Sequence, residues 1–219
     1  MNGINVKRME LGPISTNAFV LWETDGADAV LVDVPPMAGD KLRQHLAEHG
    51  LRVSEIWLTH GHWDHMGGVH EFAGEGVKIR GHRADEQLFL NPRLTQGVFL
   101  PGLELLPAKI THWLEDGEFF DLWGRRVETL HCPGHCPGNV AFYLPTEEIC
   151  FAGDVIFSGS VGRTDLPGGD YKLLETSILQ KIYSLPDEVT LAVGHGPDTS
   201  VGREKATNPF VREIGRAHV

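Results

Sequence analysis

Apolar residues occur along this chain in short runs with the spacing of strands and in longer stretches with the spacing of helices. Turn residues such as Gly12-Pro13 and Asp25-Gly26 separate the short runs, as expected between neighbouring strands. A strand-rich stretch also runs from about residue 113 to residue 157. The individual runs predict these strands: Ile4–Leu11, Ala18–Trp22, Ala29–Val34, Val53–Leu58 and Val189–Val193.

Two stretches predict helices. Asp40–His49 places Leu42 and Leu46 on one face, and Gly50 follows it as a terminating residue. Tyr171–Leu185 carries apolar residues at the spacing of a buried helix face. Strands followed by a helix therefore occur twice along the chain. This order predicts an α+β fold in which two sheets pack together and the helices lie outside them.

Length and composition narrow the class of protein. The 219 residues suit one domain, 1–219, and 41% hydrophobic residues are typical of a globular chain. A net charge of -11 argues against a general nucleic-acid binder. We expect no membrane span, because no apolar run is long enough to cross a bilayer. The N-terminus has no secretory pattern, and three cysteines are too few for a disulfide framework. We therefore expect a cytoplasmic protein.

Histidines change this picture, because four metal-binding side chains, three histidines and one aspartate, occur together in THGHWDH at Thr59–His65. The segment follows a predicted strand, so His60 and His62 can point inward from the same loop. Asp64 and His65 come one turn later and can face a neighbouring position. Four such residues in six positions exceed what one tetrahedral ion takes from a short loop. The alternative is a solvated histidine-rich turn, but the pattern favours two neighbouring metals.

Three more candidate ligands follow predicted strands or turns. His135 lies in the tight turn HCPGHCPG, Asp154 follows an apolar run through Gly153, and His195 follows the last predicted strand. Taken singly, they could be a turn histidine, a turn aspartate and a surface histidine. Taken with the first motif, they supply the ligands that two ions still need. Asp154 is suited to bridge the two ions.

These motifs resemble the metallo-β-lactamase superfamily in order and across nearly the whole chain. The resemblance implies a four-layer αββα sandwich with the metals at one edge of its two sheets. Imidazole and carboxylate ligands suit zinc, iron or manganese, and we expect two zinc ions. The implied ligands are His60, His62 and His135 for the first metal, and Asp64, His65 and His195 for the second, with Asp154 bridging.

Within that superfamily, GRTDLPGGD at Gly162–Asp170 and TSVGREKATNPF at Thr199–Phe210 are similar to short hydroxyacylglutathione hydrolase-like proteins, also called type II glyoxalase II. The chain departs from that group at HCPGHCPG, where threonines are usual, and at Asp33–Pro36, where DVPP replaces D-P-G. We also expect no helical C-terminal extension of the kind that helps full-length glyoxalase II to bind glutathione. The departures spare the metal ligands and concern glutathione recognition.

The resemblance implies hydrolysis of a small-molecule thioester such as an S-acylglutathione. Two metals would lower the pKa of a bound water and supply hydroxide for attack on the carbonyl. Asp64 could orient that hydroxide, and a thiolate of pKa about 8.5 departs with little acid assistance. Arg163 and Tyr171 are candidate substrate contacts by resemblance. Each has a structural alternative, which for Arg163 is an ion pair that braces its loop.

Several other functions use similar residues. A persulfide dioxygenase of this fold uses one iron held by two histidines and an aspartate, but the complete second ligand set and the Leu-Pro after GRTD disfavour it. The same hydroxide could open a lactone or a β-lactam. A binding module with a vestigial site is disfavoured by the intact set of seven ligands. A nuclease is disfavoured by the acidic charge.

Overall fold

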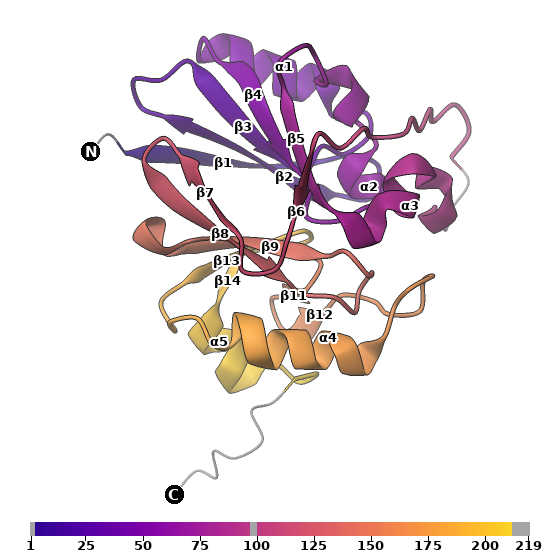
Figure 1. Ribbon diagram of the computed structural model, residues 1–219, viewed down its shortest axis with the longest axis vertical. Helices are drawn as coiled ribbons and strands as arrows, with labels where there is room; N and C mark the ends of the chain where they lie inside the picture. The colour runs from indigo at the N-terminus through magenta and orange to yellow at the C-terminus, as the bar shows by residue number, and fades with distance from the viewer. Residues whose placement is uncertain (1–2, 97–99, 212–219) are drawn as a thin grey trace, which may run out of the picture.

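Two six-stranded sheets lie face to face in the computed structural model, which describes residues 3–96 and 100–211. Helices cover the outer face of each sheet, so the molecule has four layers (Figure 1). The first half of the chain builds the upper sheet and its helices, and the second half builds the lower sheet and its helices. The predicted αββα sandwich is confirmed.

The first sheet has the strand order β1-β2-β3-β4-β5-β6. Its first three strands pair in antiparallel fashion, and β3 to β6 are parallel. The strands are β1 (Ile4–Leu11), β2 (Thr16–Glu23), β3 (Asp28–Val32), β4 (Arg52–Trp57), β5 (Lys78–His82) and β6 (His112–Leu114).

The second sheet has the order β14-β13-β10-β9-β8-β7. Its neighbours are antiparallel except for the parallel pair β10 and β13. The strands are β7 (Phe119–Leu122), β8 (Arg125–His131), β9 (Val140–Leu144), β10 (Ile149–Gly153), β13 (Thr190–Val193) and β14 (Thr199–Ser200). A separate two-stranded hairpin consists of β11 (Ile156–Phe157) and β12 (Ser160–Val161).

Helices are short in this fold. The α-helices are α1 (Gly39–Glu48), α2 (Trp63–Met66), α3 (Glu86–Leu90), α4 (Tyr171–Ser177) and α5 (Val201–Thr207). The 3-10 turns are Val69–Glu71, Arg83–Asp85, Pro92–Thr95 and Pro145–Glu147. The helix predicted over residues 171–185 begins at Tyr171, where the side chain of Asp170 caps it by accepting from the backbone N–H of Leu173. It continues as a π-helical segment, Ile178–Ile182.

The sequence did not predict strand β5, because Ile79 is the one large apolar residue in its segment KIRGH. The guanidinium of Arg80 in this strand is buried between the two sheets. Its Nε donates to Glu55 Oε2 at 2.8 Å, and its Cζ lies 3.9 Å from the ring centre of Phe120. An ion pair and an aromatic ring thus allow a charge to occupy a position that an apolar residue normally fills.

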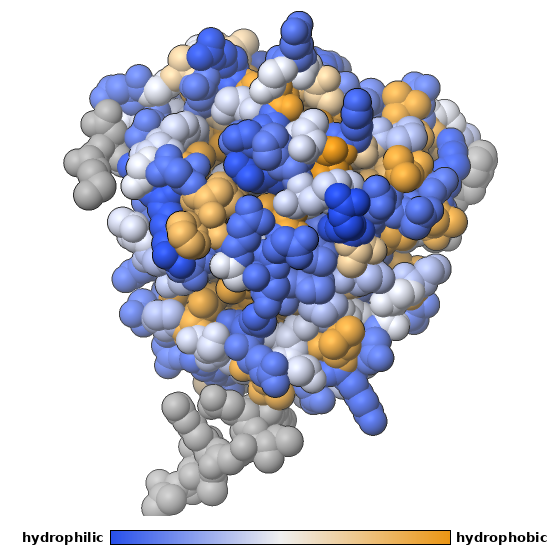
Figure 2. All heavy atoms as spheres, in the orientation of Figure 1, coloured by the Kyte–Doolittle hydropathy of each residue, from blue (hydrophilic) through white to orange (hydrophobic). Residues whose placement is uncertain are grey.

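Three apolar layers hold the sandwich together. The central layer joins the inner faces of the sheets, where Phe19 from β2 meets Phe151 from β10 with ring centres 5.1 Å apart. Two outer layers place Leu42 of α1 against the first sheet and Leu174 of α4 against the second. On the face drawn in Figure 2, apolar residues form separate patches within a mostly hydrophilic surface. Within the described ranges, no helix is long and apolar enough to cross a membrane.

Candidate metal centre

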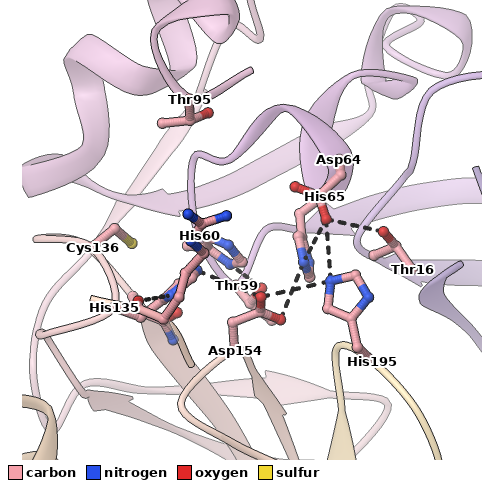
Figure 3. Close-up of polar contacts among 12 residues, drawn as sticks. Thr16, Thr59, His60, Asp64, His65, Thr95, His135, Cys136, Asp154 and His195 are labelled. Atoms are coloured by element: carbon pink, nitrogen blue, oxygen red, sulfur yellow. Dashed lines mark hydrogen bonds and ion pairs between the residues drawn. The ribbon is translucent and has the colours of Figure 1, made fainter. Parts of the chain in front are cut away.

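All seven predicted ligands meet where strands from both sheets end, and Figure 3 labels all of them except His62. The loop after β4 carries His60 and His62 and continues into α2, which carries Asp64 and His65. The other ligands come from three segments of the second sheet: His135 from the turn between β8 and β9, Asp154 from the end of β10, and His195 from the end of β13. Strand ends of two sheets therefore bring residues 60 and 195 to one place.

The first group is a cluster of three imidazoles. His60 and His62 have ring centres 4.6 Å apart, and the ring of His135 lies 4.9 Å from His60 and 4.4 Å from His62. One nitrogen from each ring lies within 4.8 Å of the other two. All three residues are buried. Three converging imidazoles are a common ligand set for a divalent transition metal.

The second group combines two imidazoles with a carboxylate. Oδ2 of Asp64 lies 3.2 Å from Nε2 of His195 and 3.3 Å from Nε2 of His65. The hydroxyl of Thr16 donates to the same oxygen at 3.0 Å. His65 is fully buried, whereas the side chain of His195 is 28% exposed. This half of the centre is therefore the one that opens toward solvent.

Asp154 lies between the two groups. Its Oδ1 is 3.2 Å from Nε2 of His65, and its Oδ2 is 3.5 Å from Nε2 of His135 and 3.6 Å from Nε2 of His195. The carboxylate thus contacts both the first group and the second. Glycine at position 194 leaves room for it, because a Cβ there would lie 2.1 Å from Asp154 Oδ1. This position suits the bridging role that the sequence predicted.

Buried polar atoms without hydrogen bonds test whether the site fits metal ions. Nε2 of His60, His62, His65 and His135, and Oδ1 of Asp154, are buried and carry no hydrogen bond. Leaving such atoms unpaired is costly, and so many of them in one place need a common partner. Divalent cations would satisfy all of these atoms together. The residues present therefore fit a centre with two metals.

For three of the rings, a partner of Nδ1 explains why Nε2 faces the centre. Nδ1 of His65 donates to Asp33 Oδ2 at 2.7 Å, and Nδ1 of His135 donates to the carbonyl of Arg163 at 2.7 Å. Nδ1 of His60 lies 3.0 Å from the hydroxyl of Thr59, which itself donates to Asp33. Such partners fix the ring orientation and leave Nε2 free as a ligand.

Two buried carboxylates that support the centre were missed by the sequence interpretation. Asp33 follows β3 and accepts from Thr59 as well as from His65. Asp85 accepts from the backbone N–H of Gly61 at 2.8 Å and of Gly138 at 2.6 Å, and so joins the loops on which His60, His62 and His135 lie. Asp33 at the end of a strand was a signal that could have been used, but nothing in the sequence marks Asp85.

Electrostatics differ between the two groups. Burial lowers the pKa of all three imidazoles in the first group, to about 3 for His62. Burial also acts to lower the pKa of His65, but Asp154, Asp64 and Asp33 outweigh it and raise that pKa well above its ordinary value. The pKa of His195 is also raised, against its burial, by Asp64 and Asp154. In the metal-free protein at neutral pH, the imidazoles of the first group are therefore neutral, whereas His65 holds a proton.

A cavity of about 440 Å³ opens onto the centre. Its lining combines apolar residues, among them Ile14, Trp63 and Phe157, with the polar side chains of candidate ligands. Arg163 also lines it, and its guanidinium donates twice to Asp165, at 2.7 and 2.8 Å. Tyr171 lies outside this lining, and its hydroxyl donates to the carbonyl of Phe210 at 2.6 Å.

Comparison with known proteins agrees with the geometry. The family model described as the metallo-beta-lactamase superfamily matches residues 11–195. The chain is 36% identical to the probable metallo-hydrolase YqgX of Bacillus subtilis, over 94% of this chain and 96% of that protein. It is also 36% identical to the hydroxyacylglutathione hydrolase GloC of Haemophilus influenzae, over 95% of this chain and 98% of that protein.

Solved structures give the same result. The BLEG-1 B3 metallo-beta-lactamase superposes with a TM-score of 0.85 at 37% identity, over 95% of this chain and all of that chain. A di-iron-bound form of TTHA1623 superposes with a TM-score of 0.81 at 38% identity, over 94% of this chain and all of that chain. The fold, the matched span and the sequence identity agree, and this chain belongs to the metallo-β-lactamase superfamily.

Proposed function

We propose that this chain is a metal-dependent thioesterase whose substrates are S-acylglutathiones or related small thioesters. The observation that carries the proposal is the complete set of seven ligand-type side chains beside a cavity of about 440 Å³. The 36% identity to a hydroxyacylglutathione hydrolase supports the choice of substrate. The described ligands would hold two divalent metals, for which zinc is our choice and iron or manganese the alternatives.

When bound, such metals supply Lewis acidity and a nucleophile at neutral pH. Asp64 is placed to orient that nucleophile, because its Oδ2 is fixed by the hydroxyl of Thr16 and faces the cavity. Burial acts to raise the pKa of Asp64, but His65 and His195 outweigh it and hold that pKa well below its ordinary value. The carboxylate therefore stays charged and accepts a hydrogen bond at neutral pH.

The leaving group also favours a thioester. Apart from the candidate ligands, the described lining of the cavity includes no lysine, tyrosine or cysteine that could protonate a departing group. A thiolate of pKa about 8.5 departs without such help, whereas an alkoxide or an amide nitrogen needs a proton. Arg163 is the permanently charged cation in the described lining. We infer that it contacts a carboxylate of the substrate, while its hydrogen bonds to Asp165 hold the guanidinium in place.

β-Lactam hydrolysis is the second candidate function. The specific observation in its favour is the 37% identity to BLEG-1, whose whole chain is covered. Both reactions need the same nucleophile and differ in the group that leaves.

We also propose a cytoplasmic location, which is supported by three buried cysteines that are free thiols.

The test is an activity panel on the purified, metal-loaded protein. An S-acylglutathione, a lactone, a β-lactam and glutathione persulfide with an oxygen electrode are compared by kcat/KM, together with metal analysis. We expect the thioester to have the highest kcat/KM, and we expect Arg163→Gln to raise KM for it with little change in kcat. Faster turnover of the β-lactam would establish the second candidate instead. Oxygen uptake with one iron per chain would overturn hydrolysis altogether.

A further inference from the structure

A second cluster of metal-binding side chains lies at the C-terminal end of α1, on the outer side of the first sheet (Figure 1). His45, Glu48 and His49 follow one another at intervals of three and four residues, which places them on the same side of the helix. One ligand atom from each lies within 4.8 Å of the other two. A hollow of about 570 Å³ opens beside them, and it shares no lining residue with the cavity at the metal centre.

The ring of His49 is oriented so that one of its nitrogens is free to bind a metal. Its Nδ1 lies 2.9 Å from the carbonyl oxygen of His45, and it can make this bond only as the donor. The lone pair is therefore on Nε2, and the ring is exposed to solvent. Nδ1 of His65 and of His135 at the metal centre donate to oxygen atoms in the same manner.

His45 supplies an independent observation. The residue is 9% exposed, and its Nε2 is buried without a hydrogen bond. Four other imidazole nitrogens among the described residues are buried without a hydrogen bond. They are the Nε2 atoms of residues at the metal centre: His60, His62, His65 and His135. A buried nitrogen without a partner is costly. Burial also lowers the pKa of His45, so the ring is neutral at pH 7 and its lone pair is available.

The charges around this cluster would both attract and repel a bound cation. The carboxylate of Glu48 brings a negative charge, and Gln44 orients it by donating to Oε1 at 2.8 Å. The cluster lies at the C-terminal end of α1, where the helix dipole also favours a cation. Against these, the ammonium groups of Lys7 and Lys41 line the same hollow. The balance predicts binding that is weaker than at the metal centre.

We propose that His45, Glu48 and His49 form a further binding site for a divalent transition metal of the zinc class. Two imidazoles and one carboxylate are a sufficient set of protein ligands for such an ion, and water completes the coordination. The site is separate from the catalytic centre and does not depend on the reaction catalysed there.

Zinc titration of the full-length, metal-loaded protein tests this site. We expect the wild type to bind one more equivalent of Zn²⁺ than His49→Ala, measured by calorimetry and by metal analysis after gel filtration. His49→Ala should bind the additional ion at least about tenfold more weakly. The loss of a residue that only supports a ligand already costs that much in metal affinity. Because His49 is exposed, its replacement should leave folding intact. Lys41→Ala is the matched variant on the same helix, and it should bind the additional ion more tightly.

Trp22 gives a spectroscopic signature of the same site. Its ring centre lies 5.4 Å from that of His45 and 5.2 Å from that of His49. Binding of paramagnetic Co²⁺ should therefore quench part of the tryptophan fluorescence in the wild type, and neither His49→Ala nor Trp22→Phe should show this component. Equal Zn²⁺ stoichiometry and equal affinity in the wild type and His49→Ala would overturn the proposal. Quenching that persists in Trp22→Phe would place the ion elsewhere and overturn it as well.

Discussion

The two halves of the metal centre share one loop but differ in charge. His60 and His62 face another imidazole, His135, and burial keeps these rings neutral. His65 comes only three residues later, yet it faces carboxylates on both of its ring nitrogens. The difference arises because α2 begins at Trp63, so Asp64 and His65 lie on a helical turn whereas His60 and His62 lie on the loop before it. One short segment thus provides two unlike sites.

This difference implies that the two halves bind metal differently. A metal that enters the first group meets imidazoles that are already free of protons at neutral pH. A metal that enters the second group must displace the proton of His65, whose pKa is raised. We therefore expect the affinity of the second group to fall more steeply with decreasing pH than that of the first.

Asp154 belongs to both halves, so Asp154→Asn should have the largest effect. The loss of its charge leaves His65, His135 and His195 without the carboxylate between them. Thioesterase activity should fall by more than about a hundredfold. That is the largest loss expected from replacing a residue that only supports a ligand. Metal analysis and kcat/KM of the purified variant measure the effect. Asp198→Asn, at a surface carboxylate, is the control, and activity near the wild-type level in Asp154→Asn would contradict a bridging role.

Asp33 and Asp85 offer a way to separate the halves. Asp33→Asn weakens the acceptor of His65 Nδ1, and Asp85→Asn disturbs the link between the loops of the first group. We expect Asp33→Asn to lose affinity mainly at the second group and Asp85→Asn mainly at the first, each by about 10- to 100-fold. Metal competition titrations and the spectra of Co²⁺-substituted protein distinguish the two groups.

The outcome that counts against this division is an equal loss from both groups in both variants. General unfolding is excluded by comparing the denaturant midpoint of each variant with that of the wild type. Both aspartates are buried, so some loss of stability is expected in each. The comparison therefore depends on which group loses its metal, and the total metal content is not sufficient.

The pH dependence of the metal-free protein tests the same difference without changing any residue. Three imidazoles of the first group have lowered pKa values in the folded state, so unfolding takes up protons below pH 6.5 and stability falls as pH decreases. His65 and His195 have raised pKa values, so their stabilising contribution is complete below 6.5 and is lost as pH rises above it.

Stability without metal should therefore be greatest near pH 6.5, the ordinary imidazole value. Each imidazole that takes up a proton on unfolding adds a slope of about 1.4 kcal/mol per pH unit. Urea midpoints of the chelated protein between pH 4 and pH 9 measure this curve. A maximum that lies well away from 6.5 would contradict the difference between the halves. Metal-loaded protein, in which these nitrogens are occupied, should have a flatter profile near neutral pH.

Sequence reasoning predicted many of the strands and identified the candidate ligands, because both depend on local patterns. Periodic apolar runs mark the strands, and His60 to His65 lie within one short motif. Asp85 could not be predicted in this way, since its partners are backbone N–H groups from two distant loops. Helix α5 was missed for a similar reason. Its Glu204 is buried as the acceptor of the Thr199 hydroxyl at 2.6 Å, whereas a glutamate in a charged segment indicates an exposed position.

Hairpin β11–β12 contributes Phe157, Ser160 and Val161 to the wall of the cavity but supplies none of the candidate ligands. It is attached to the end of α5, where Glu204 accepts from the backbone N–H of Gly159 and Asn208 donates to the carbonyl of Ser160. Mutations in this wall can therefore accumulate while the reactive centre stays unchanged. Such a separation allows a different substrate to be accommodated by evolution, or by design, through a few substitutions in one small hairpin.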